Sequence, residues 1–260
     1  MMSKIRVNIT CPSIWDFDVF LKLHSPNQQR IWDDYEFYLN QTSGNFDFWI
    51  VLEQFDETTK LNVKAGNVFL VTMEEKDVVP SFSKEYLSQF DQVITSRDDV
   101  IHENTILSHY FTKWHVGKSY DELLAEVDNV RTKTKELSAI ISSRVQYGTH
   151  QRRYAFINKL KGHFKNRLDW YSKNENPLDD KWDGLHQYKY SIAVENGSHE
   201  RYFTEKLVDV ILSDTIPIYW GAPDVSKYFN EEIIQSIPLN DFEKSIDAVS
   251  YTHLTLPTIA

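Results

Sequence analysis

The chain has 260 residues and a formal net charge of −10, with 41% hydrophobic and 25% charged residues. This is the composition of an ordinary globular protein, and the length suits one large domain or two smaller ones. The single cysteine, Cys11, excludes an internal disulfide, and the acidic balance argues against a protein that coats nucleic acid. No stretch has the apolar length of a spanning helix or a signal peptide. We therefore expect a cytoplasmic protein and leave open its peripheral association with the inner face of a membrane.

Short runs of β-branched and aromatic residues alternate along the chain with segments of helical spacing. The runs predict eight strands, at Ile5–Ile9, Phe48–Leu52, Val68–Thr72, Gln92–Thr95, Leu137–Ser142, Arg167–Tyr171, Tyr190–Val194 and Thr215–Tyr219. Three helices are predicted, each with an apolar stripe: Tyr120–Val130 (Leu123, Leu124, Val127), Arg153–Phe164 (Phe156, Ile157, Leu160) and Glu205–Leu212 (Leu207, Val208, Ile211, Leu212). This alternation indicates an α/β fold with parallel sheets.

The two halves of the chain differ in character, which indicates two doubly wound domains with a cleft between them. We expect an N-terminal α/β domain over residues 1–115 and a charged, mostly helical connector over residues 116–135. A second α/β domain follows over residues 136–249. Residues 250–260 carry no Asp, Glu, Lys or Arg from Tyr251 onward, and we interpret them as a non-native tail on a truncated domain rather than a native strand.

The window from Tyr188 to Tyr228 concentrates the polar residues that could bind a ligand. It predicts a strand, a polar loop, a helix capped by Thr204 and a second strand ending at Gly221. Lys206 lies in the first turn of the helix, where free N–H groups and the helix dipole favour an anion such as a diphosphate. Glu195 and Asn196 leave the end of the first strand, where ligands bind in open α/β sheets. We expect Gly221 to let the backbone approach that ligand.

The order of these residues resembles the signature of the α-1,3/4-fucosyltransferases, glycosyltransferase family 10. The family motif runs aromatic-Lys-aromatic, Glu-Asn, Tyr-x-Thr-Glu-Lys and Pro-x-x-x-Gly. Its four parts stand here as Tyr188–Tyr190, Glu195–Asn196, Tyr202–Lys206 and Pro217–Gly221. The similarity covers about residues 136–245. One departure is Val194, where many members of the family have an aromatic residue before the Glu.

The resemblance implies a GT-B fold, in which two Rossmann-like domains face each other across a cleft. It also implies inverting transfer of fucose from GDP-fucose to a glycan hydroxyl in α-1,3 or α-1,4 linkage, with no metal ion in the chemical step. By the same resemblance Arg153, or Arg152 as the alternate, binds the donor diphosphate together with Lys206. Two carboxylates, Glu205 and Glu195, are then expected to face the guanosine ribose or the fucose. The donor site is also expected to include the side chains of Tyr202 and Asn196.

Inverting transfer needs a carboxylate that takes the proton of the acceptor hydroxyl. In the family this is a Glu that follows a strand of the N-terminal domain, and Glu74 follows the predicted strand Val68–Thr72 in that way. Glu53, which follows Phe48–Leu52, is the alternative base. Two other functions stay open: transfer from another nucleotide sugar, and GDP binding by a truncated chain without turnover.

Overall fold

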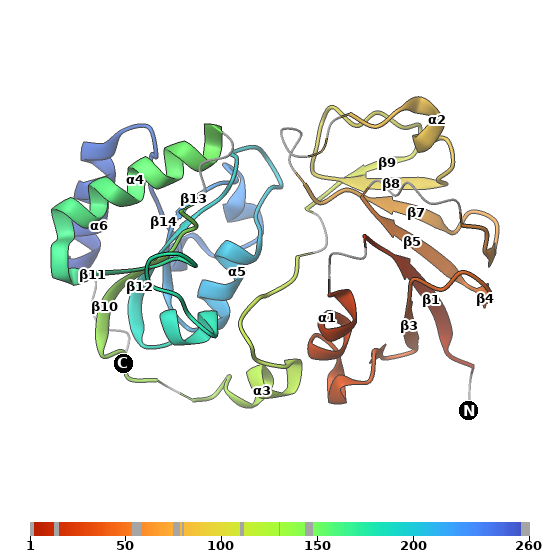
Figure 1. Cartoon of the computed structure of the whole chain (residues 1–260), viewed down its shortest axis with the longest axis horizontal. Helices are drawn as coiled ribbons and strands as arrows, with labels where there is room; N and C mark the ends of the chain where they lie inside the picture. Colours follow the sequence, from red (N-terminus) through yellow and green to blue (C-terminus); the bar gives the residue numbers. More distant parts are fainter. Residues whose placement is uncertain are drawn as a thin grey trace. The chain divides into compact units, whose positions relative to one another are not determined.

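The computed structural model describes residues 3–12, 16–53, 59–74, 79, 81–109, 112–129, 131–143 and 148–255. The chain divides into two compact units, each built around its own sheet (Figure 1). Unit 1 comprises Met1–Phe111 and Lys118–Val127, and unit 2 comprises Thr112–Gly117 and Asp128–Ala260. The segment Thr112–Gly117 therefore belongs to unit 2, although the chain on both sides of it belongs to unit 1.

Unit 1 is built on a seven-stranded sheet with the order β2-β3-β1-β5-β7-β8-β9, parallel except for the β2–β3 pair. Its strands are β1 (Ile5–Thr10), β2 (Ile31–Trp32), β3 (Tyr35–Leu39), β5 (Phe48–Leu52), β7 (Val68–Val71), β8 (Gln92–Thr95) and β9 (Thr105–Leu107). Two further strands, β4 (Asn45–Phe46) and β6 (Asn62–Val63), pair with each other. The helical elements are α1 (Phe17–Leu23), η1 (Pro26–Gln28), α2 (Lys84–Leu87) and α3 (Tyr120–Ala125). Leu87 of α2 packs with Val51, Leu70 and Val93 in a core against one face of the sheet.

Unit 2 is built on a five-stranded parallel sheet with the order β11-β10-β12-β13-β14. Its strands are β10 (Lys135–Ile140), β11 (Leu168–Tyr171), β12 (Tyr188–Val194), β13 (Ile216–Trp220) and β14 (Gln235–Ser236). Its α-helices are α4 (Gly148–Phe164), α5 (Glu205–Leu212) and α6 (Phe242–Thr255). Short 3-10 turns lie between these elements, at η2 (Lys165–Arg167), η3 (Lys181–Gly184), η4 (Val225–Lys227) and η5 (Glu231–Ile233).

The helices of unit 2 cover both faces of this sheet. Ile157 and Leu160 of α4 and Val249 of α6 join the cluster built on alternate strand residues such as Ala139 and Ile192. Successive residues of a strand point to opposite faces, so α4 and α6 share one face. α5 packs against β12 and β13 from the other face (Figure 1). The sheet order and the two helical layers are those of a doubly wound α/β unit.

Each of the eight predicted strands corresponds to a strand of the structure, within two residues at either end. The sequence did not predict six strands, which are β2, β3, β4, β6, β9 and β14. Most of these lie at sheet edges or in the small second sheet. Half-exposed side chains and lengths of two to five residues leave them without a clear period-two pattern.

Two of the predicted helical stripes differ from the structure. Among the described residues of the connector, Tyr120–Ala125 forms the one helix, and a capping box between Ser119 and Glu122 starts it. Leu124 is 57% exposed, so this stripe has no core to cover. In α5 the buried residues are Leu207, Asp209 and Val210, so Leu207 of the predicted stripe is buried, whereas Val208, Ile211 and Leu212 are half-buried.

The connector and the tail were both predicted as distinct segments. Because the strand β10 begins at Lys135 and α3 is short, residues 116–135 are not a mostly helical connector. Residues 250–260 were interpreted as a non-native tail. The helix α6 continues to Thr255, while the side chains from 251 onward and all of residues 256–260 lie outside the described residues.

Candidate functional site

Glu195 holds the start of α5. It directly follows β12, its backbone N–H donates to the Trp220 carbonyl of β13 (2.9 Å), and its side chain is fully buried. Its Oε1 accepts from the Thr204 backbone N–H and its Oε2 from the Thr204 hydroxyl, both at 2.7 Å. Thr204 in turn caps α5 by accepting from the Lys206 backbone N–H at 3.2 Å. Glu195 was expected to face the ribose or the fucose; its burial and its bonds to Thr204 do not agree with that expectation.

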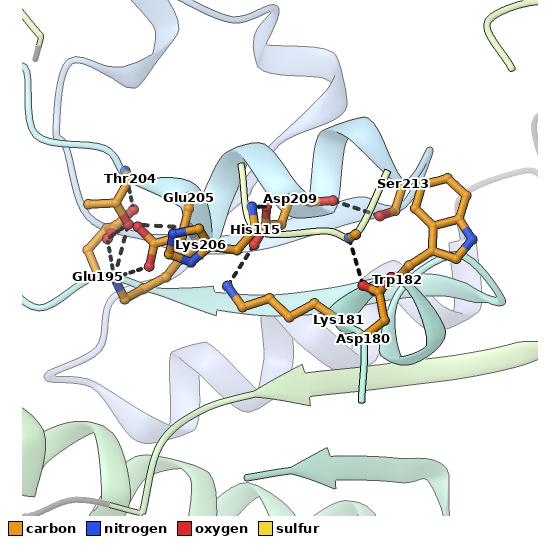
Figure 2. A network of polar contacts seen from close by, with 11 residues as sticks. His115, Asp180, Lys181, Trp182, Glu195, Thr204, Glu205, Lys206, Asp209 and Ser213 are labelled. Carbon is orange, nitrogen blue, oxygen red and sulfur yellow. Dashed lines mark hydrogen bonds and ion pairs between the residues drawn. The ribbon is translucent and has the colours of Figure 1, made fainter. Parts of the chain in front are cut away.

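The Lys206 ammonium lies among oxygen atoms at the N-terminal end of α5 (Figure 2). Its Nζ is 3.0 Å from the Thr204 hydroxyl, 3.2 Å from Glu205 Oε1 and 3.5 Å from Glu195 Oε2. Burial disfavours the charged form of Lys206, but the carboxylates of Glu205 and Glu195 outweigh it and raise the pKa of the ammonium. Conversely, although burial opposes it, Lys206 with Lys181 holds the pKa of Glu205 well below its usual range. Lys206 therefore carries a fixed positive charge at this helix end.

A second cation, Arg153, comes from α4. Its side chain is buried, and its Nη1 donates to Asn196 Oδ1 at 2.5 Å. Its Nε is buried and makes no hydrogen bond within the part of the chain that the structure describes. Burial lowers the pKa of Arg153, while the charges of Glu195 and Glu205 oppose that shift. A guanidinium stays protonated in this setting, so the site brings two cations to the carboxyl end of β12.

The alternate residue, Arg152, lies on the exposed side of α4. Because α4 begins at Gly148, Arg153 lies in its second turn rather than at its start. One residue of register decides which arginine faces the sheet, since neighbouring helical residues are about 100° apart.

Gly221 and Tyr202 complete the predicted donor-site residues. A Cβ on Gly221 would overlap the Tyr219 hydroxyl and Glu195 Cγ, so this glycine is required by protein packing within the described structure. The Tyr219 hydroxyl accepts a hydrogen bond from the Ala222 backbone N–H at 3.0 Å. Tyr202 is buried, and its ring stacks on that of His199 with centroids 4.6 Å apart.

The segment Thr112–Gly117 is fastened to unit 2 by two carboxylates (Figure 2). The buried Asp209 of α5 accepts from the His115 backbone N–H through Oδ1 (2.6 Å) and pairs with Lys181 through Oδ2 (2.7 Å). Asp180 accepts from the Gly117 backbone N–H at 2.9 Å. Burial lowers the pKa of His115 to about 4, with Lys181 adding to the effect and Glu205 opposing it. The imidazole is therefore neutral at physiological pH.

The two candidate bases lie in unit 1. Glu53 follows β5, and its side chain is 3% exposed. Its Oε1 accepts from the backbone N–H groups of Met73 and Glu74. Glu74 is partly exposed just beyond β7.

The Asp16–Asp18 pair has the Asp-x-Asp form of a metal motif, but both residues make other contacts. Asp16 caps α1, and Asp18 forms ion pairs with Lys22 and Arg30.

The comparisons with known proteins concern mainly unit 2. Residues 130–254 match the model of the family described as "Glycosyltransferase family 10 (fucosyltransferase) C-term". Residues 130–254 are therefore similar to the C-terminal domain of glycosyltransferase family 10, and we call them the family 10 domain. This family 10 domain contains Arg153, Glu195 and Lys206, whereas Glu53 and Glu74 lie outside it.

Curated relatives align with short stretches of the chain. The chain is 38% identical over 93 residues to an α-(1,3)-fucosyltransferase, FucT, of Helicobacter pylori. This aligned stretch makes up 35% of this chain and 18% of that protein. It is 41% identical over 59 residues to an α-(1,4)-fucosyltransferase of Arabidopsis thaliana. This second stretch makes up 21% of this chain and 15% of that protein. The chain thus spans less than a fifth of the length of these relatives.

Solved structures align with almost the whole chain. A crystal structure of an α1,3-fucosyltransferase with GDP covers 97% of this chain, and 79% of its own length, at a TM-score of 0.60 and 19% identity. Another, with GDP-fucose, covers 96% of this chain and 78% of its own at a TM-score of 0.56 and 18% identity. The likeness confirms that the chain has a fold of the GT-B type.

The sequence did not predict the contacts that fasten Thr112–Gly117 to the family 10 domain. Asp209 is the one charged residue in the middle of an apolar helix, Leu207–Leu212, and that position is the signal that could have been noticed. None of the described helices is long and apolar enough to cross a membrane.

Proposed function

We propose that the chain binds GDP-fucose at the carboxyl edge of the sheet in unit 2 and transfers fucose to a glycan hydroxyl with inversion. The observation that carries this proposal is the pair of cations, Arg153 and Lys206, beside the N-terminus of α5. Backbone N–H groups, the helix dipole and two fixed charges together make a site for a diphosphate. The names of the relatives and of the similar structures support GDP-fucose as the donor.

In this proposal Arg153 and Lys206 stabilise the negative charge that develops on the departing GDP. Glu195 keeps Thr204, and with it the first turn of α5, in position, while Asn196 orients the Arg153 guanidinium. The two cations make a divalent metal ion unnecessary for the chemical step. Glu74 takes the proton of the acceptor hydroxyl, because the carboxylate of Glu53 is buried and already engaged. The acceptor we propose is a glycan that contains N-acetylglucosamine or glucose.

Calorimetric titration of the purified chain with GDP, GDP-fucose, UDP and ADP tests the donor site. Selective binding of the two guanosine ligands is expected. Equal affinity for all four ligands would contradict the assignment of the donor, and GDP binding without any transfer would leave a binding function in place of the transferase. The cytoplasmic location and the peripheral membrane association stay predictions.

A further inference from the structure

Glu53 is held by its own backbone at the carboxyl end of β5. Its φ of 60° lies in the left-handed region, which a non-glycine residue enters only at a cost. Its backbone N–H donates to the Val71 carbonyl of β7 at 2.9 Å, and its carbonyl accepts from the Tyr86 hydroxyl of α2, also at 2.9 Å. These contacts fix the direction in which the side chain leaves the strand.

The carboxylate of Glu53 is directed at the end of the neighbouring strand. Two successive N–H groups, from Met73 and Glu74, donate to its Oε1, the second at 2.6 Å. Its Oε2 is buried and has no hydrogen-bond partner among the described residues. An oxygen that accepts from two successive backbone N–H groups restrains the backbone at those two residues, as a bound anion does in a backbone nest.

Three polar or charged residues lie near this carboxylate. Glu74 lies at the end of β7, and Tyr86 reaches the Glu53 carbonyl from α2. After β8, the buried Arg97 is paired with Asp99 at 2.7 Å. Burial raises the pKa of Glu53 to about 7; the Glu74 charge adds to the shift, while the two amides and Arg97 oppose it.

We propose that Glu53 is a positioning residue: its carboxylate fixes the backbone at Met73 and Glu74 and so sets where the Glu74 side chain leaves the sheet. This inference rests on the proposed function of Glu74 as the base. Glu53 does not take the substrate proton itself, because its oxygens lie inside the protein.

The test compares Glu53→Ala and Glu53→Gln in the full chain. Transfer is followed as GDP release from GDP-fucose with an acceptor that contains N-acetylglucosamine. Glu53→Ala is expected to lower kcat by roughly 10- to 100-fold, because a small displacement of a reacting group has that effect, with the KM for GDP-fucose unchanged. Glu53→Gln keeps an oxygen acceptor for both N–H groups and is expected to restore most of kcat. The wild-type kcat profile is expected to show an ionisation near pH 7 that belongs to Glu53, and this ionisation should be absent from Glu53→Gln.

The matched control is Asp91→Ala, since Asp91 Oδ2 accepts from the Val68 N–H (2.9 Å) at the other end of β7. Its kcat is expected to equal that of the wild type. A kcat loss in Asp91→Ala as large as in Glu53→Ala would overturn the proposal, because any loosening of β7 would then suffice. If Glu53→Ala does not fold, an unchanged ionisation near pH 7 in Glu53→Gln overturns it.

Hydrogen exchange separates this inference from the proposed function. Faster exchange of the amides of Met73 and Glu74 in Glu53→Ala, with Val68 unaffected, supports the positioning role in a protein of any activity. Unchanged exchange overturns it. A wild-type chain that binds GDP but leaves GDP-fucose intact, or a fully active Glu74→Gln, contradicts the proposed function instead.

Discussion

The backbone N–H of His115 donates a 2.6 Å hydrogen bond to the carboxylate of Asp209, a residue 94 positions further along the chain. The same carboxylate pairs with Lys181. A segment between two parts of unit 1 is thereby fastened to the helix whose N-terminus forms the candidate donor site. The fastening depends on a buried charge, so removing that charge has a measurable cost.

We expect Asp209→Asn to lower the free energy of unfolding by about 1–3 kcal/mol, because it leaves the Lys181 ammonium without its counter-ion. The effect lies below that of a fully buried pair, since the Lys181 side chain is 28% exposed. Urea unfolding measures it. Asp214→Asn, which changes an aspartate that is 66% exposed, is the control and should stay within about 0.5 kcal/mol of the wild type.

Lys206→Ala should weaken GDP binding by roughly 1.5–3 kcal/mol, the range for hydrogen bonds to a charged group. Calorimetry measures the change. Lys244→Ala removes a lysine that is 76% exposed and should leave GDP affinity as it is. Equal affinities of wild type and Lys206→Ala would remove Lys206 from the diphosphate site.

Gly221→Ala is expected to destabilise the chain by about 1–3 kcal/mol, because the new Cβ meets the Tyr219 hydroxyl and Glu195. Displacing Glu195 also disturbs the cap of α5, so GDP affinity should fall as well. Gly162→Ala in α4 is the matched control: its Cβ meets nothing within 4 Å, and it should be neutral or stabilising by up to about 1 kcal/mol. Similar unfolding midpoints for the two variants would contradict this reading of the packing.

The stability of unit 1 should depend on pH through Glu53. Its pKa is about 7 in the folded chain, against a reference value of 4.5, so the folded state keeps a proton that the unfolded state releases. The stabilisation is fully present below pH 4.5 and is lost as the pH rises through 7. Relative to Glu53→Gln, the wild type should lose about 3 kcal/mol of unfolding free energy over that interval. Urea unfolding at several pH values checks this, and the exposed Glu85→Gln should show no such difference.

Transfer should continue in excess EDTA at nearly the untreated rate, because Arg153 and Lys206 supply the positive charge on the leaving group. Initial rates with and without the chelator measure this. A loss of activity that manganese restores would mean that the two cations do not suffice.

The sequence predicted those elements of the fold that a local pattern specifies. It did not predict those that depend on residues distant in the chain. The runs Phe48–Leu52 and Tyr190–Val194 are central strands, the first half-buried to buried and the second buried throughout, and their residues alone indicate strands. The N-cap at Thr204 was likewise readable, since the capping residue and the helix are neighbours. By contrast, β9 is an edge strand whose pairing with β8 no local pattern specifies.

Within the site, the sequence indicated the residues but not their arrangement. It named Glu195, but its burial follows from Thr204 and Gly221, which pack on it from two other segments. It could not pair Asp209 with Lys181, which lies 28 residues earlier in a short turn. It named Glu53 and Glu74 as rivals, while the contact across neighbouring parallel strands links them.

The assignment of Thr112–Gly117 to unit 2 bears on how the family 10 domain can be excised. A fragment that begins at residue 130, where the family match begins, lacks the backbone N–H groups that Asp209 and Asp180 accept from. One buried carboxylate would then lose a hydrogen bond at the helix that carries Lys206. A fragment that begins at Thr112 keeps both hydrogen bonds.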